Sequence, residues 1–248
     1  DRLYQLPLGV IGVAIGVVLL PDLSRKLRAG KDAAALASQN RALELSLFLT
    51  LPAAMALMAI PAPIIHTVYE HGAFTRADTM AVAPAVLVFA AGLPAFALIK
   101  VFQPGFYARE DTATPMRFAI VSVVVNIAAS LALAQVFGHV GIAMGTTIAA
   151  WVNAFQLAFT LNRRGHFALD QRLRQRLPRI VLAALAMGAL LLAGKHLLAG
   201  NYAEGAGFLA ALWGLALLVA GGISSYFLLA HVTGAMKIGE LKAMLKRS

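Results

Sequence analysis

The 248 residues are 60% hydrophobic and only 13% charged, and they carry 21 Lys and Arg against 11 Asp and Glu. A soluble domain usually has about 25% charged residues because its surface faces water. The mean hydropathy of +0.78 therefore excludes an ordinary soluble domain and indicates a surface that faces lipid. The chain has no Cys, which excludes disulfide frameworks and Cys-ligated metal sites.

Seven apolar segments are long enough to cross a hydrocarbon core, which takes about 20 residues. As core helices of a soluble protein they would need a polar coat that this sequence lacks. We therefore expect an all-α, polytopic membrane bundle of seven transmembrane helices. The segments are Leu3–Leu20, Leu45–Ile65, Met80–Phe102, Phe118–Phe137, Val140–Leu161, Ile180–Leu198 and Phe208–Ala230.

The basic residues give an independent test of this count. Seven spans place the connecting segments alternately on two sides of the membrane, and one side receives 17 of the 21 Lys and Arg. By the positive-inside rule this side faces the cytoplasm, which puts the C-terminus inside. Because the basic residues are divided among short segments, we do not expect nucleic-acid binding. The four segments are 21–44, 103–117, 162–179 and the tail from residue 231, with five, two, six and four Lys and Arg respectively.

Small residues and prolines punctuate the spans. Gly12 and Gly16, and then Gly141 and Gly145, have the G-x-x-x-G spacing that lets two helices approach closely in lipid. We expect this packing within one bundle rather than in a dimer. Interior prolines, found in several spans, each remove a backbone hydrogen bond and can bend a helix. Such bends are either tolerated or used around a transport cavity.

The segment 164–179 has Leu169, Leu173 and Leu177 at helical spacing with three Arg between them. This pattern predicts a short amphipathic helix on the cytoplasmic leaflet, with a solvated connector as the alternative. It is also the best internal boundary. The expected units are 1–163 (five spans of one lobe), 164–179 (the connector) and 180–248 (two further spans and a basic tail).

Motifs of enzymes are absent: the sequence has no H-E-x-x-H, no phosphate-binding P-loop and no G-x-S-x-G. Ser224, Ser225 and His231 share one region, but helical serines usually bond their own backbone. We therefore expect no enzymatic activity.

Polar residues near or within apolar spans are the better candidates for function, because a charge in hydrocarbon costs about 2.5 to 3.5 kcal/mol. Arg2 lies directly before the first span, with Gln5 one turn later; Arg2 is either a cavity residue or a helix-end anchor. Asn126 and Thr146 lie inside the fourth and fifth spans, where they supply neutral oxygens for a ligand or for a hydrogen bond between helices.

The stretch "QPGFYAREDTATP", residues 103–115, lies between the third and fourth spans. Its P-G-F-Y-x-R-x-D-x-x-T-P pattern resembles the signature loop of the MurJ (MviN-type) lipid II flippases, of the multidrug/oligosaccharidyl-lipid/polysaccharide exporter superfamily. The opening "DRLYQLPLGVIGVAIGVVLLPDLSR", the "YEHGAF" at 69–74 and the "GHVGIAMGTTIAAWVNA" from 138 fit the same family in order. The resemblance covers nearly the whole chain and is weakest after Arg164.

The resemblance implies a fold of fourteen helices: two six-helix lobes around a cavity and two appended helices. Under this resemblance the seven spans would be the last seven, and we expect the chain to be the C-terminal half of a longer protein, in keeping with Asp at residue 1. The implied activity is movement of an undecaprenyl-diphosphate-linked peptidoglycan precursor across the bacterial inner membrane by alternating access. We expect this half alone to be inactive. The alternatives are a polysaccharide-lipid or drug exporter of the same superfamily, or a non-transporting membrane scaffold.

The resemblance also assigns residues. Arg2 matches a cavity arginine that engages the diphosphate, and Gln5 stands where some members have an acidic residue. Some relatives bind Na⁺, and Asn126, the Ile142 carbonyl and Thr146 would fit that ligand set, although Ser130 stands in place of an acidic ligand. No other cofactor is expected. Arg109 and Asp111 would shape the cytoplasmic gate.

Overall fold

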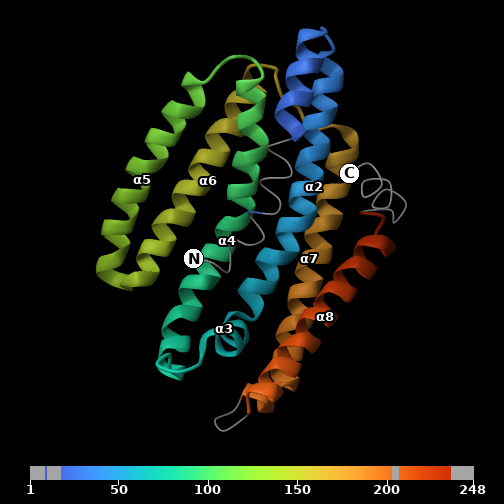
Figure 1. Cartoon of the computed structure of the whole chain (residues 1–248). Coiled ribbons are helices and arrows are strands. Elements are labelled where there is room, and N and C mark those ends of the chain that lie inside the picture. The colour runs from blue at the N-terminus through green and yellow to red at the C-terminus, as the bar shows by residue number, and fades with distance from the viewer. Residues whose placement is uncertain (1–8, 10–17, 203–206, 236–248) are drawn as a thin grey trace.

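The computed structural model describes residue 9, residues 18–202 and residues 207–235, and every regular element in this part is helical (Figure 1). This confirms the all-α prediction. A first helical segment covers residues 18–28. The later elements are α2 (Asp32–Ala59), α3 (Pro61–Tyr69), α4 (Arg76–Tyr107), α5 (Ala113–Phe137), α6 (His139–Arg163), α7 (Gln171–Leu197), the 3₁₀ turn η1 (Ala199–Tyr202) and α8 (Phe208–Val232).

Six of these helices, α2 and α4 to α8, are long and apolar enough to cross a membrane. The expected span Leu3–Leu20 lies almost wholly outside the described residues, so these residues do not test the count of seven. Consecutive spans run in opposite directions (Figure 1). The turn 29–31, the turn 108–112 and the loop 164–170 lie at the upper end in this view, which we call the cation-rich end. The lower end, with α3 and the start of α4, is the cation-poor end.

The second span differs from the prediction of one helix over Leu45–Ile65. The chain breaks at Ile60, whose φ of −128° and ψ of 44° are not helical, and α3 begins at Pro61. Proline lacks a backbone N–H and suits the first position of a helix, where that donor has no partner. α2 also begins earlier than expected, at Asp32, so most of the predicted loop 21–44 is helical. Gly30, with φ +66°, makes the turn before it.

α7 begins before the predicted span and continues through it. The Asp170 carboxylate accepts a hydrogen bond from the Leu173 backbone N–H at 2.7 Å, which caps the helix start. Residues 171–179 are therefore the first turns of α7 and not a separate amphipathic helix. Of the three leucines in the pattern, Leu173 is fully buried against the bundle, whereas Leu169 is exposed.

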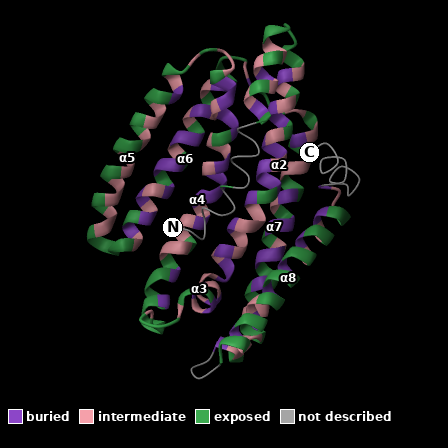
Figure 2. Ribbon diagram, viewed as in Figure 1, coloured by how far each residue is buried: buried purple, intermediate pink, exposed green. Residues whose placement is uncertain are grey.

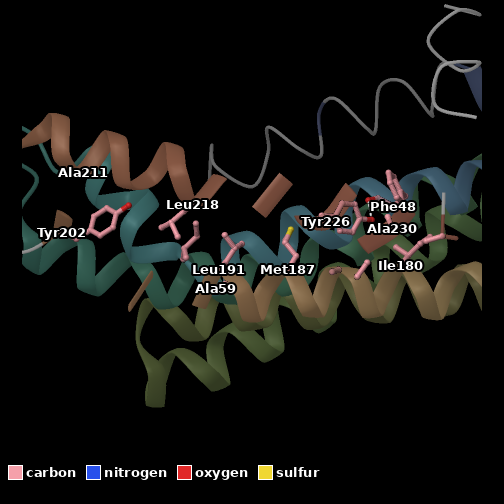
Figure 3. Packing of buried hydrophobic residues seen from close by; sticks show 14 residues of the cluster. Phe48, Ala59, Ile180, Met187, Leu191, Tyr202, Ala211, Leu218, Tyr226 and Ala230 are labelled. Atoms are coloured by element: carbon pink, nitrogen blue, oxygen red, sulfur yellow. Dashed lines mark hydrogen bonds between the residues drawn. The ribbon is translucent and has the colours of Figure 1, made fainter. Parts of the chain in front are cut away.

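The buried side chains form two main clusters, and α2 contributes to both. One lies between α2, α7 and α8, where Phe48, Met187, Leu191, Leu218 and Tyr226 meet (Figure 3). The Tyr226 hydroxyl donates to the Phe48 carbonyl at 2.7 Å, which satisfies a polar group inside this cluster. The other cluster joins the first helix, α2, α4, α6 and α7 near the cation-rich end.

α5 is the exception, because almost none of it is buried (Figure 2). It packs along α6 and has few contacts with other described helices. Gly141 and Gly145 of α6 make this packing possible. A Cβ at Gly141 would overlap the Leu133 carbonyl, and one at Gly145 would overlap Ser130. The predicted close packing at this G-x-x-x-G is confirmed; Gly12 and Gly16 lie outside the described residues.

Candidate functional site

The signature loop, residues 103–115, is partly helical in the structure. α4 continues past its predicted end at Phe102 to Tyr107, so Pro104 and Gly105 belong to its last turn. A Cβ on Gly105 would lie 2.7 Å from the Gln39 Nε2 atom of α2. The glycine therefore permits a close approach of α2 and α4 where the signature begins.

Asp111 organises the turn between α4 and α5. Its Oδ1 atom accepts from the Thr114 backbone N–H at 2.9 Å and so caps the start of α5. Its Oδ2 atom lies 2.6 Å from the Arg164 guanidinium, which also donates to the Thr114 hydroxyl at 3.2 Å. The hydrogen bonds from Thr114, and then that from Arg164, lower the pKa of Asp111 to about 2.

Arg164 joins three helices at the cation-rich end. It follows the last residue of α6, binds the Asp111 turn before α5, and places its guanidinium 5.7 Å from the centre of the Phe106 ring of α4. We did not single out Arg164 in the sequence. It lies 53 positions from Asp111, and nothing in the sequence pattern indicates this pairing.

Arg109 does not pair with Asp111. Its guanidinium turns back along α4 and donates to the Gly105 carbonyl at 2.8 Å. Burial lowers the pKa of Arg109, and the nearby Asp32 carboxylate opposes this shift. Burial, followed by the charges of Arg109 and Arg164, also lowers the pKa of His166 in the loop 164–170. The structure thus brings the two predicted gate residues to one turn but gives them different partners.

A second ionic contact at this end joins α2 to α7. The buried Glu44 carboxylate accepts from Arg172 Nε at 3.0 Å and from Arg176 Nη1 at 2.6 Å. Nearby, the Asn40 side-chain amide donates to the Ala168 carbonyl at 2.9 Å, which holds the loop 164–170 against α2. Hydropathy alone places Glu44 at the end of a loop and does not extend α2 and α7 to the charged residues, so this contact was not predicted.

Asn126, Ile142 and Thr146 do come together, between α5 and α6. The Asn126 Oδ1 atom accepts from Ser130 Oγ at 2.9 Å and from Thr146 Oγ1 at 3.5 Å. Thr146 Oγ1 also donates to the Ile142 carbonyl at 3.1 Å.

Hard cations prefer such oxygens. The four oxygens, from Asn126, Ser130, Ile142 and Thr146, are all neutral, however. The described residues also hold no group of three His, Cys, Asp or Glu side chains that could bind a metal. The observed arrangement is a hydrogen-bonded cluster between two helices, and Na⁺ binding by this cluster stays a prediction.

Arg2 and Gln5, the predicted diphosphate-binding residues, lie outside the described residues. Their place in a cavity therefore stays a prediction.

A family model described as "Lipid II flippase MurJ" matches residues 1–212. Over 247 residues the chain is 43% identical to each of two proteins named "Probable lipid II flippase MurJ", from Rhizobium tropici and from Rhizobium meliloti (strain 1021). It covers 46% of each, and so spans about half the length of these curated relatives. A solved structure of a lipid II flippase MurJ in an inward closed conformation matches with a TM-score of 0.75 at 25% identity, over 93% of this chain and 45% of that one.

Proposed function

The chain belongs to the lipid II flippase MurJ family, and we propose that it forms one half of the protein that moves a lipid-linked peptidoglycan precursor across the membrane. The observation that carries this proposal is that the fold matches a solved lipid II flippase MurJ over 93% of the chain. The chain is a multi-pass membrane protein of the bacterial inner membrane. The bias of Lys and Arg supports a cytoplasmic C-terminus.

Transport of a diphosphate through hydrocarbon requires that protein groups replace its hydration. An arginine suits this task, because its planar guanidinium can bind two phosphate oxygens at once. We assign this role to Arg2, with Gln5 as its neighbour one turn later. The membrane potential can bias the cycle, since moving one elementary charge is worth about 2.3 kcal/mol per 100 mV.

The cation-rich end would act as the cytoplasmic gate. Opening of this gate would require α4, α5 and α6 to separate from one another, or to move as one unit relative to the rest of the bundle. The Asp111–Arg164 ion pair and the Arg109–Gly105 hydrogen bond lie where these three helices meet. If Arg109→Ala in the complete protein leaves growth and flipping unchanged, the gate role of Arg109 is wrong.

The decisive experiment replaces Arg2 by Ala and by Lys in the complete reading frame, in a strain that depends on this gene. We expect Arg2→Ala to abolish growth and lipid II translocation at normal membrane abundance, and Arg2→Lys to retain part of both. Arg28→Ala is the matched control, because Arg28 is exposed at the cation-rich end. Growth of Arg2→Ala at normal abundance would favour a non-transporting scaffold. Transport of a different lipid-linked substrate would favour an exporter.

A further inference from the structure

Residues of α3, the start of α4, the end of α7 and η1 line a small cavity. In Figure 1 the labelled α3 and the start of α4 lie at the cation-poor end. The volume of the cavity is about 260 Å³. This is below the roughly 300–1,000 Å³ of sites for drug-sized ligands, so the cavity suits one small group. The side chains with polar groups that line it are His66, Glu70, Arg76, Thr79, Lys195, His196 and Tyr202.

The charges in this cavity are unusual for its end of the bundle. Only four of the 21 Lys and Arg lie outside the segments assigned to the cytoplasmic side. Two of these four, Arg76 and Lys195, line the same small cavity although they are 119 positions apart. Their convergence is not explained by the positive-inside rule, which disfavours cations at this end.

The one carboxylate in the cavity does not neutralise both cations. The Glu70 Oε2 atom accepts from the Thr79 hydroxyl at 2.6 Å and lies 2.8 Å from His66 Nδ1. Arg76 uses one nitrogen to donate to the Tyr202 carbonyl at 2.8 Å. Among the described residues, no hydrogen bond or ion pair engages the Lys195 ammonium.

The apolar part of the lining increases the electrostatic attraction that these positive charges exert on an anion. Ala62, Pro63, Met80 and Ala199 form an apolar wall, and charges act more strongly beside low-dielectric walls than in bulk water. Arg76 and Lys195 supply the two types of side chain that bind phosphate, a planar fork and a compact ammonium.

We propose that this cavity is an anion-binding site for a phosphate group, with Lys195 and Arg76 as its ligands. The phosphate comes either from a lipid headgroup at the membrane surface or from a free phosphate compound. The proposal uses residues other than Arg2 and Gln5 and does not depend on transport.

The test uses the complete protein, purified in an uncharged detergent, with pyrophosphate as the probe. A ligand that binds the folded state raises the midpoint of thermal unfolding. We expect pyrophosphate to raise the midpoint of the wild type, and Lys195→Gln to weaken the apparent affinity about tenfold, as expected for the loss of one charge-assisted contact. In an Arg2→Ala background, which removes the proposed diphosphate-binding residue, the double variant Arg76→Gln/Lys195→Gln should show no shift.

The control removes two positive charges from the opposite end, by Arg28→Gln/Lys31→Gln, and should bind pyrophosphate as the wild type does. The Lys195 ammonium has no partner among the described residues, so Lys195→Gln breaks no described contact and should fold. The single variant therefore still tests the proposal if the double variant does not fold.

A second arm places the protein in nanodiscs of phosphatidylcholine with or without phosphatidylglycerol and measures retained lipid by native mass spectrometry. Retention of phosphatidylglycerol by the wild type but not by Lys195→Gln identifies a lipid headgroup as the source. Pyrophosphate binding without this preference identifies a free phosphate. Equal binding by the wild type and Lys195→Gln, or no binding of either probe, overturns the proposal.

Discussion

Two helix pairs in this bundle are held together in opposite ways. α5 and α6 meet through glycines and neutral oxygens, with their backbones close together. α2 and α7 meet through large apolar side chains and through a buried carboxylate between two arginines. In lipid the hydrophobic effect does not drive helices together, so close packing and polar contacts must do so. The α5–α6 pair depends mainly on close packing, and the α2–α7 pair depends partly on polar contacts.

The largest effect should come from the glycines. Gly141→Ala places a methyl group against the backbone carbonyl of Leu133, which cannot move without shifting α5. We expect the free energy of unfolding to fall by about 3 kcal/mol, measured as a lower unfolding midpoint in detergent and lower membrane abundance. Gly221→Ala in α8 is the control, because its new Cβ meets open space. Equal behaviour of the two variants would show that α5 and α6 are not closely packed.

The ionic contact of α2 with α7 should come next. Glu44→Gln removes the buried carboxylate that Arg172 and Arg176 contact between α2 and α7. Breaking a fully buried pair costs roughly 3–5 kcal/mol, and partial exposure of Arg172 reduces this to about 2 kcal/mol. The same unfolding measurement tests it. Glu110→Gln removes an exposed carboxylate at the same end and should have almost no effect; a similar loss in both variants would contradict a structural role for Glu44.

The exposed ion pair of Asp111 should contribute less and should depend on pH. Its pKa is lowered from 3.8 to about 2 in the folded protein, so the unfolded chain binds more protons between these values. Stability from Asp111 is therefore present above about pH 4 and is lost as the pH falls towards 2. Unfolding midpoints of the wild type and Asp111→Asn should differ above pH 4 and converge below it. A constant difference across this range would assign the effect to packing.

The smallest effect should come from the oxygen cluster between α5 and α6. Hydrogen bonds between membrane helices average about 0.6 kcal/mol, and Asn126→Ala should cost about this much. The same variant tests Na⁺ binding in the complete protein. If Na⁺ binds, NaCl will raise the unfolding midpoint of the wild type above its value in KCl, and Asn126→Ala will abolish that difference. Equal midpoints in the two salts would leave the cluster with a purely structural role.

The contrast between the two pairs also shows what could be predicted from the sequence. The apolar lengths predicted six spans of the described bundle and their order along the chain, because a helix that crosses lipid must be long and apolar. The cytoplasmic side that the distribution of Lys and Arg indicates stays a prediction. The glycine spacing predicted the α5–α6 contact, and the family resemblance predicted that Asn126, Ile142 and Thr146 come together.

The charged contacts were missed for a physical reason. Hydropathy ends a span where charged residues begin, but α2 and α7 continue past that point, and their charges then pair with each other. Glu44 with Arg176, and Asp111 with Arg164, are distant in sequence and become neighbours only through the bundle. The break at Ile60 could have been predicted from Pro61 and Pro63, because proline suits the first turn of a new helix as well as a bend within one span.

The exposure of α5 has a mechanical consequence. Since α5 is attached to the described bundle mainly through α6, the two helices form a lever whose stiffness comes from the seam at Gly141 and Gly145. A displacement of α5 at its exposed face would be transmitted to α4 through α6. At the cation-rich end it would also be transmitted through Arg164, which contacts Asp111 and Phe106. The α5–α6 pair therefore offers a route by which a neighbouring helix could displace the signature loop, residues 103–115, without contacting it directly.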